Sequence, residues 1–329
     1  MNSLNIHPTN SFALFGGGLV LVELATYLKS IGASVHVFTS ERLAESTGKE
    51  STLAEQMADL NIPCNVTPKI DKDVDAADIA TSGGIGLSFG APWIFRASFI
   101  DLWEGRLLNS HPAPLPQHRG GGGYSWRILM NERRGETCVH VVTPGLDEGD
   151  IVWSKPYIFG EECLVPTDYE SVAVCRDILS LRELLDTFRN GTSLPLTAQD
   201  HSSSSYFPRL KTDTHGWVNW THTADEIVRF VRAFDQPYAG ASTTIRGHDV
   251  RIMGAHLADD SLTFHPFQAG LIYRISDGQY FIASNGGGIR VSEITPYSTE
   301  NPLLQLGDRL VTPNVKLDAA LEIRASYRP

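Results

Sequence analysis

The chain has 329 residues, of which 42% are hydrophobic and 20% are charged. At roughly 100–200 residues per domain this length favours two domains, and the composition excludes a disordered or low-complexity protein. The net charge of −11 disfavours general binding of nucleic acids, because such binding depends on cations that neutralise phosphates.

Strands and helices alternate through the first third of the sequence. Apolar runs predict short strands, and longer segments with apolar residues at helical spacing predict the helices between them. The predicted strands include 11–15, 35–38 and 106–111, and the predicted helices are 19–32, 52–61 and 97–105. This alternation is typical of an α/β protein with a doubly wound, mostly parallel, Rossmann-like sheet.

The pattern changes after residue 150. Segment 151–159 alternates like a strand, and 169–191 has the spacing of a long amphipathic helix. A further helix is predicted from Thr223, a candidate N-cap with Glu226 three residues later. From about residue 240, short β-like runs separated by Gly and Asp predict a small antiparallel, OB-like barrel. We therefore expect a first domain at 1–197, a Ser/Thr/Asp/Pro-rich linker at 198–212 and the barrel domain at 213–329.

The glycines after the first strand invite comparison with a dinucleotide-binding turn. Gly16 and Gly18 fit the G-x-G-x-x-G pattern, but Leu21 stands where its third glycine belongs. Glu41 lies near the place of a ribose-binding acid. Because the fingerprint is incomplete, the sequence favours a tight structural turn, and a dinucleotide-dependent oxidoreductase stays an alternative.

Candidate chemistry lies at the end of the 106–111 strand. Asn109 and His111 are two residues apart, so their side chains should face the same site. Ligands of open parallel sheets bind at the carboxyl ends of the strands. A second apolar strand at 139–142 is followed by an acidic loop that could bring a carboxylate to His111. An Asn-x-His pair alone is a weak signal, because a single histidine is more often structural.

The combination of motifs is more specific. The segment N-x-H-P-x-x-L-P-x-x-R-G, with L-D-x-G-D-I beginning at Leu146, resembles the 10-formyltetrahydrofolate-dependent formyltransferases. That family includes methionyl-tRNA formyltransferase, glycinamide ribonucleotide formyltransferase and the nucleotide-sugar N-formyltransferases. Segments W-R-I-L, F-P-R-L and A-F-D-Q-P-Y-A-G extend the resemblance into the second half. This favours members with a second domain over the single-domain glycinamide ribonucleotide enzyme. After the H-P, where the family often has S-L-L-P, this chain has A-P-L-P.

The resemblance assigns roles to residues of this chain. It implies formyl transfer to a primary amine, with 10-formyltetrahydrofolate as cosubstrate and no metal. Asn109 and a protonated His111 would stabilise the oxyanion. Asp147 would orient the imidazole, favour its charged form and help take the amine proton, and the sequence leaves open which group receives that proton first. The implied folate-binding positions, some of which core packing would also explain, are Trp93, Ile94, Phe95, Val142, Pro144 and Leu146. The candidate substrate-binding positions are Arg119, Gly120, Gly121, Arg209 and Lys211.

The acceptor amine is less well defined. The initiator-tRNA enzymes carry a basic insertion after the second strand, whereas segment 40–56 here has Arg42 and Lys49 against four glutamates. We therefore expect a small amine, best a nucleotide-linked amino sugar whose pyrophosphate meets Arg209 and Lys211. A solvated linker would also explain that pair, and the run of glycines at 120–123 fits either a flexible loop or close approach of substrate.

Several alternatives stay open. Methionyl-tRNA or a small free amine would be other acceptors, and a hydrolase would release formate from the same folate. A non-catalytic binding module would keep the fold alone. No apolar run reaches the roughly 18 residues of a membrane span, and the N-terminus lacks a signal-peptide pattern, so we expect a cytoplasmic protein without a membrane partner. Four cysteines without a C-x-x-C pair predict reduced thiols. The oligomeric state, a homodimer included, is left open.

Overall fold

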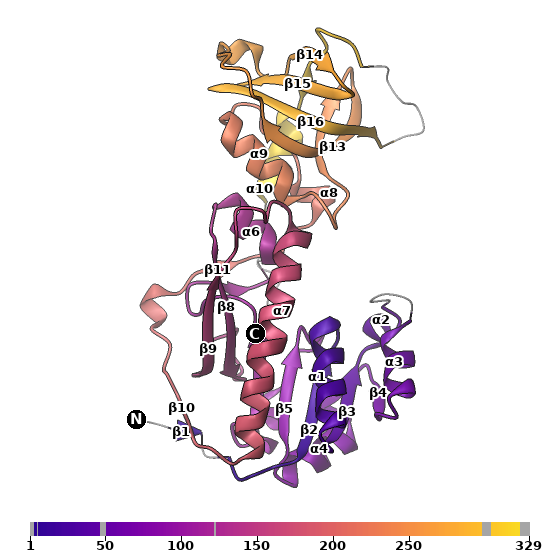
Figure 1. The fold of residues 1–329 in the computed structure, drawn as a ribbon, viewed down its shortest axis with the longest axis vertical. Helices are drawn as coiled ribbons and strands as arrows, with labels where there is room; N and C mark the ends of the chain where they lie inside the picture. The colour runs from indigo at the N-terminus through magenta and orange to yellow at the C-terminus, as the bar shows by residue number, and fades with distance from the viewer. Residues whose placement is uncertain (1–2, 5, 47–50, 122, 298–303, 323–329) are drawn as a thin grey trace.

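Two β-sheets lie one above the other along the long axis of the molecule (Figure 1). The structure, a computed structural model, describes residues 3–4, 6–46, 51–121, 123–297 and 304–322. The lower part is a mixed sheet covered by helices, and the upper part is a curled antiparallel sheet. The fold class predicted from the sequence is therefore confirmed.

The lower sheet has seven strands in the described residues, in the order β4-β3-β2-β5-β6-β8-β9. The strands from β4 to β6 pair in parallel, and β8 and β9 add to that edge in antiparallel fashion. The bounds are β2 Ser11–Gly16, β3 Ser34–Thr39, β4 Cys64–Val66, β5 Ile85–Phe89, β6 Leu107–His111, β8 Arg134–Val141 and β9 Ile151–Ile158. β6 is an interior strand, with β5 on one side and β8 on the other. Its carboxyl end therefore lies between the loops that follow these two neighbours.

Helices cover both faces of this sheet. Alternation along β2 sends Phe12 and Leu14 into a core with the helices α1 and α7, and sends Ala13 and Phe15 into a core with α4 and α5. A tight turn joins β2 to α1, and a Cβ on Gly16 would lie 2.2 Å from the Phe89 carbonyl oxygen. This packing gives the turn a structural reason for its first glycine. The helices are α1 Leu19–Ser30, α2 Glu41–Ala44, α3 Leu53–Asp59, α4 Val74–Thr81, α5 Ala97–Leu102 and α7 Pro166–Arg189.

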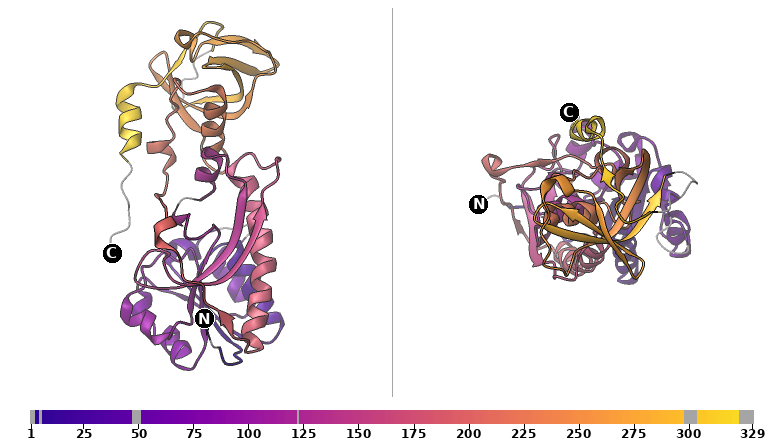
Figure 2. Two further views of the ribbon diagram at one scale, coloured as in Figure 1. Left: turned by 90° about the vertical axis from the view of Figure 1, so that its left-hand side faces the viewer. Right: turned by 90° about the horizontal axis from the view of Figure 1, so that it is seen from above.

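The upper sheet has six antiparallel strands in the described residues, in the order β14-β15-β16-β13-β12-β17. Helix α9 (Ala224–Ala233) packs against it, and Thr223 and Glu226 form the predicted capping box. Helices α8 (Thr212–His215) and α10 (Asn314–Leu321) contact each other beside this sheet (Figure 2). The strand bounds are β12 Ala241–Ile245, β13 His248–Leu257, β14 Ile272–Ser276, β15 Gln279–Ser284, β16 Gly287–Pro296 and β17 Leu310–Val311.

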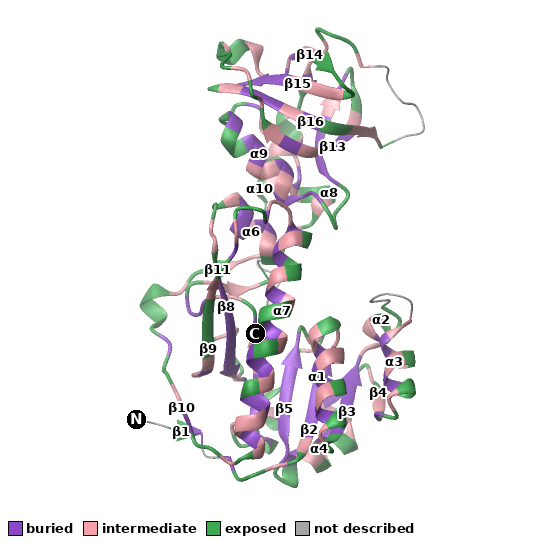
Figure 3. Cartoon of the chain, viewed as in Figure 1, coloured by how far each residue is buried: buried purple, intermediate pink, exposed green. Residues whose placement is uncertain are grey.

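Helix α7 connects the two parts. Its C-terminal half packs into the core on one face of the lower sheet, through Leu184 and Phe188 among others. Its N-terminal half, with Tyr169 and Ala173, belongs to the core that contains α6 (Gly123–Leu129), α9 and the upper sheet. Figure 3 shows buried residues along the whole length of this helix. One rigid element therefore belongs to both cores.

The predicted linker 198–212 carries structure of its own. Its strand β11 (Tyr206–Phe207) pairs in parallel with β7 (Arg119–Gly120), the short strand after the Pro-rich loop. A second small pair joins β1 (Ser3–Leu4) to β10 (Leu194–Pro195). Short 3₁₀ turns occur at Ile70–Lys72, His201–Ser203 and Pro266–Gln268.

Two further observations concern the chain as a whole. All four cysteines are unpaired. Among the described residues, none of the helices combines the length and the apolar character that a bilayer crossing requires.

Candidate functional site

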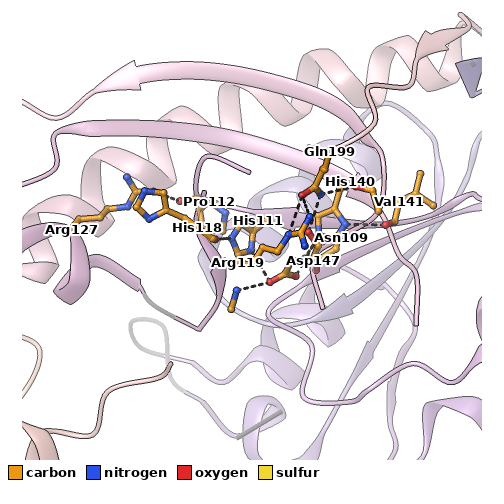
Figure 4. A network of polar contacts seen from close by, with 12 residues as sticks. Asn109, His111, Pro112, His118, Arg119, Arg127, His140, Val141, Asp147 and Gln199 are labelled. Atoms are coloured by element: carbon orange, nitrogen blue, oxygen red, sulfur yellow. Dashed lines mark hydrogen bonds and ion pairs between the residues drawn. The ribbon is translucent and has the colours of Figure 1, made fainter. Parts of the chain in front are cut away.

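A cleft of about 550 Å³ opens where β5 and β6 end. Strand ends supply Asn109 and His111, and the loop after β8 supplies Asp147, so the cleft gathers the three predicted catalytic side chains. Its lining comprises Ser88, Gly90, Ala91, Trp93, Ile94, Phe95, Asn109, Ser110, His111, Pro112, Gly120, Gly121, His140, Val142, Thr143, Pro144, Gly145, Leu146, Asp147, Tyr206 and Arg209. Figure 4 shows the polar network at its floor.

Asn109 is held by a neighbour across the sheet. The register of β6 and β8 places Asn109 opposite His140, and the Asn109 Nδ2 group donates to His140 Nε2 at 3.2 Å. His140 Nδ1 in turn donates to the Val141 carbonyl at 2.9 Å, so in a neutral ring Nε2 is the acceptor. Within the described residues the second N–H of Asn109 has no protein partner. It is free for a ligand in the cleft.

His111 lies at the end of β6 with its ring buried. Its Nε2 donates to the His118 carbonyl at 2.6 Å, and its Nδ1 lies 3.7 Å from Asp147 Oδ2. Burial lowers the pKa of His111, and the Asp147 charge opposes this without cancelling it. The imidazole is therefore neutral near pH 7, unlike the protonated ring expected from the sequence. Sequence patterns do not report desolvation, which decides this charge.

Asp147 is fixed on both sides. Its Oδ2 accepts the Gly120 N–H at 2.9 Å, and its Oδ1 lies 3.5 Å from His140 Nε2. Burial opposes ionisation, and the hydrogen bond from the Gly120 N–H favours it; the net effect lowers the pKa of Asp147. The residue has φ +50°, a left-handed conformation that aspartate tolerates better than most residues. The carboxylate is therefore ionised and aimed at His111.

The loop of Asp147 rests on a buried glutamine. Gln199 Nε2 donates to the carbonyls of Asp147 and Gly149, at 2.9 and 2.7 Å. Its Oε1 accepts from Arg119 Nη2 at 2.7 Å, and the same Arg119 group lies 3.2 Å from His201 Nδ1. Arg119 therefore supports the Asp147 loop through Gln199 and does not line the cleft.

Gly120 needs to be glycine. Its φ is +95°, and a Cβ there would meet the Phe207 carbonyl oxygen at 2.7 Å. Gly121 and the exposed Arg209 also line the cleft, whereas Lys211 is exposed outside it. Gly122, and Lys49 of the segment compared with the tRNA enzymes, lie outside the described residues.

The six predicted folate-binding positions all line the cleft. Trp93 and Phe95 are half-buried and also pack against the core under α5, where Phe95 stacks on Phe99 at 5.7 Å between ring centroids. Ile94 points outward with 62% of its surface exposed. Trp93 and Phe95 thus face the cleft and the core at once.

Three contributors were missed at the sequence level: His140, Gln199 and Tyr206. His140 had a usable signal, because it is a polar residue between Val139 and Val141 on a strand that leads to the acidic loop, so its side chain points to the face opposite theirs. Gln199 and Tyr206 had none, because they reach the site from the predicted linker through long-range contacts. Among the described residues, no group of three or more His, Cys, Asp or Glu side chains is arranged to hold a metal ion.

Comparison with family models finds two matches along the chain. Residues 92–164 match the model described as "Formyl transferase". Residues 211–301 match "Formyl transferase, C-terminal domain". The first match contains Asn109, His111, Asp147 and most of the cleft lining, and the second contains most of the upper sheet.

Curated relatives carry the name methionyl-tRNA formyltransferase. The protein from Roseiflexus castenholzii is 26% identical over 247 residues, which cover 72% of this chain and 74% of that protein. The one from Syntrophus aciditrophicus is 30% identical over 199 residues, which cover 59% of this chain and 60% of the relative.

Solved structures with the same fold include sugar-modifying enzymes. WlaRD, a sugar 3N-formyl transferase crystallised with dTDP and 5-N-formyl-THF, has a TM-score of 0.68 and 18% identity, covering 89% of this chain and 100% of that one. The N-formyltransferase of Helicobacter canadensis, in complex with folinic acid and dTDP-3-aminofucose, has a TM-score of 0.67 and 18% identity, covering 87% and 99%. At this identity the similarity establishes the fold alone.

Proposed function

Because the chain belongs to the formyl transferase family, we propose that it moves a formyl group from 10-formyltetrahydrofolate to a primary amine. The observation that carries the proposal is the arrangement of Asn109, His111 and Asp147 around one cleft, with an amide N–H free for a ligand and a carboxylate facing a buried imidazole. These are the groups that acyl transfer to an amine requires.

The proposed reaction begins with attack of the amine nitrogen on the formyl carbon. The new C–N bond turns the formyl oxygen into an oxyanion, which the free N–H of Asn109 would stabilise. His111, neutral before the reaction, would accept the proton that the amine loses. Asp147, 3.7 Å from His111 Nδ1, would stabilise the imidazolium. Collapse of the tetrahedral carbon breaks its bond to folate N10, and that nitrogen takes the proton back.

The folate would bind along the two loops that flank the catalytic strand. Trp93, Ile94 and Phe95 lie on one loop, and Val142, Pro144 and Leu146 on the other, all lining the cleft. A mostly apolar cleft with a few convergent polar groups suits a flat pterin ring. The two structural relatives with 5-N-formyl-THF or folinic acid support this cosubstrate. The proposed chemistry calls for no metal.

For the acceptor we propose the amino group of a nucleotide-linked sugar. Structural relatives act on sugars, and one holds dTDP-3-aminofucose. The net charge of −11 disfavours a large polyanion, while the exposed Arg209 at the rim of the cleft offers one cation for a pyrophosphate. Of the other predicted cations, Arg119 is bound to Gln199 and Lys211 lies outside the cleft.

Methionyl-tRNA is the second candidate acceptor. The curated relatives carry this specificity in their names and extend over most of the chain. The two candidates differ in one respect that can be measured, because tRNA binding weakens steeply with salt while a single pyrophosphate contact does not.

The test is turnover of 10-formyltetrahydrofolate, followed by absorbance, with a panel of amines. The panel contains dTDP- and UDP-linked amino sugars, methionyl-tRNA, ornithine and no amine. Turnover that needs an amino-sugar nucleotide and is lost in His111→Ala is expected. Formate release without amine would instead indicate the hydrolase. If folate is neither bound nor consumed, the proposal is wrong.

A further inference from the structure

A second cavity, of about 280 Å³, lies at the junction of the two parts of the molecule. Here α6 and the start of α7 meet α9, β13 and β16 (Figure 1). We call this cavity the junction pocket. It shares no lining residue with the catalytic cleft. Its charged lining residues are Arg133, Arg229, Arg232, Arg290, Asp225 and Asp259.

The junction pocket concentrates positive charge in an acidic protein. Four arginines line it against two aspartates. Asp225 is already paired with Arg229, one turn away on α9, and Asp259 is exposed. Within the described residues, the other three arginines have no carboxylate at ion-pair distance; these are Arg133, Arg232 and Arg290. The buried Asp235 close to Arg232 accepts instead from the backbone N–H groups of residues 236 and 254.

These three arginines are held by neutral partners. Arg133 Nη1 donates to the carbonyls of Gly160 and Cys163, at 2.8 and 2.7 Å. Arg232 Nε donates to the Ala255 carbonyl at 2.9 Å, and Arg290 Nη1 donates to Gln279 Oε1 at 3.2 Å. Carbonyl and amide oxygens fix the guanidinium groups in place without neutralising them. The pocket is therefore ordered before any ligand arrives.

Two of the four arginines that line the pocket have hydrogen-bonding capacity left over. The Nε groups of Arg229 and Arg290 are buried and have no partner in the structure. Buried donors without acceptors are rare, because each costs about 1–3 kcal/mol. Like charges close together add to this cost: burial lowers the pKa of Arg232, and Arg133 and Arg290 lower it further, while Asp235 raises it. An anion would relieve both costs at once.

His256 completes the wall of the pocket. Its Nδ1 lies 3.0 Å from Arg232 Nη2. Arginine can only donate, so Nδ1 accepts and the ring of His256 carries its proton on Nε2. The imidazole thereby orients Arg232 without cancelling its charge.

We propose that the junction pocket is a binding site for a small phosphate group, separate from the catalytic cleft. Guanidinium groups match phosphate oxygens in paired hydrogen bonds, and three of them without an ion pair around one cavity suit a doubly charged oxyanion. A water occupies about 30 Å³ and drug-sized ligands need about 300–1,000 Å³. A cavity of 280 Å³ therefore admits orthophosphate or a diphosphate group. Such a ligand would bridge α9 to the turn before β8 and stabilise the junction.

The experiment measures thermal unfolding of the full-length protein against increasing phosphate, with chloride at the same ionic strength as reference. We expect a saturable rise of Tm with phosphate and none with chloride. Arg290→Gln and Arg133→Gln should each weaken the apparent Kd for phosphate at least tenfold. Arg290 is only partly buried, so Arg290→Gln should fold. Lys155→Gln on β9 removes the same charge outside the pocket and should change nothing.

Two further arms separate the sources of phosphate. Pyrophosphate should bind like orthophosphate or better, and dTDP should bind the junction pocket only through its phosphates, with the same loss in Arg290→Gln. A dTDP effect that instead disappears in Arg209→Gln would place the nucleotide in the catalytic cleft. If dTDP binding is lost in Arg209→Gln and phosphate does not raise Tm, the proposal is overturned. It is also overturned if phosphate binds and both Arg290→Gln and Arg133→Gln keep the same affinity. None of these readouts depends on folate turnover.

Discussion

The amide of Asn109 offers a direct test of the proposed chemistry, because one of its two N–H bonds is already committed. His140 Nε2 accepts the first at 3.2 Å, which leaves one donor for the oxyanion. Asn109→Ala removes that donor. The loss of one such donor typically lowers kcat by about 10²–10³, or roughly 3–4 kcal/mol of transition-state stabilisation. We expect a loss in this range, with little change in KM for folate.

His140→Ala should cost much less. It leaves the donor in place and removes one neutral hydrogen bond, worth about 1 kcal/mol, which corresponds to a loss of roughly fivefold in kcat. Because His140 is proposed to act through Asn109, the double variant should lose no more than Asn109→Ala alone. Ser110→Ala, on the same strand and lining the same cleft, controls for loss of a polar group.

The assay is the steady-state rate of 10-formyltetrahydrofolate turnover with whichever amine the panel identifies. A loss below about tenfold in Asn109→Ala would refute its role as oxyanion donor. If the two losses instead multiply in the double variant, His140 acts by a separate route, for which its 3.5 Å approach to Asp147 is the structural candidate.

Three other outcomes are expected. Burial raises the pKa of Asp177 to about 6, although a hydrogen bond from Thr137 opposes this shift. The contribution of protonated Asp177 to the free energy of unfolding is therefore complete below about pH 3.8 and is lost as the pH rises through 6. Asp177→Asn should therefore gain about 2–3 kcal/mol relative to wild type between pH 4 and 8 in urea unfolding; a difference independent of pH would contradict this. Gly120→Ala should lower kcat more than tenfold and lower the free energy of unfolding by about 1–3 kcal/mol. Gly123→Ala is the control: its Cβ would meet no atom within 4 Å, so only backbone strain should lower its free energy of unfolding. Gln199→Ala removes two anchors of the catalytic loop and should lower kcat and cost about 1–3 kcal/mol; an unchanged kcat would show that the loop keeps its position without them.

Local patterns predicted the parts of the site that depend on neighbours in sequence. The two-residue spacing placed Asn109 and His111 on one face of β6, and the acidic loop after the next apolar strand did bring Asp147 to His111. The capping box of α9 and the extent of α7 were equally local.

The rest of the site depends on contacts that spacing does not encode. The pairing of Asn109 with His140 follows from the antiparallel register of β6 and β8. The use of Arg119 as a brace for Gln199 follows from the path of the predicted linker across the back of the loop. The neutral state of His111 follows from its burial, which only the folded chain creates.

The placement of α7 in two cores has a consequence for synthesis of the chain. Tyr169 and Ala173 leave the ribosome early, yet their core is closed by strands as far along as Leu310. Roughly 140 residues separate the two ends of that core, which takes about 7–30 seconds at 5–20 residues per second. During this interval the lower sheet can hold the C-terminal half of the helix while the N-terminal half presents an apolar face to solvent or to a chaperone. A nascent chain stalled in this window should be the form of the protein most prone to aggregate.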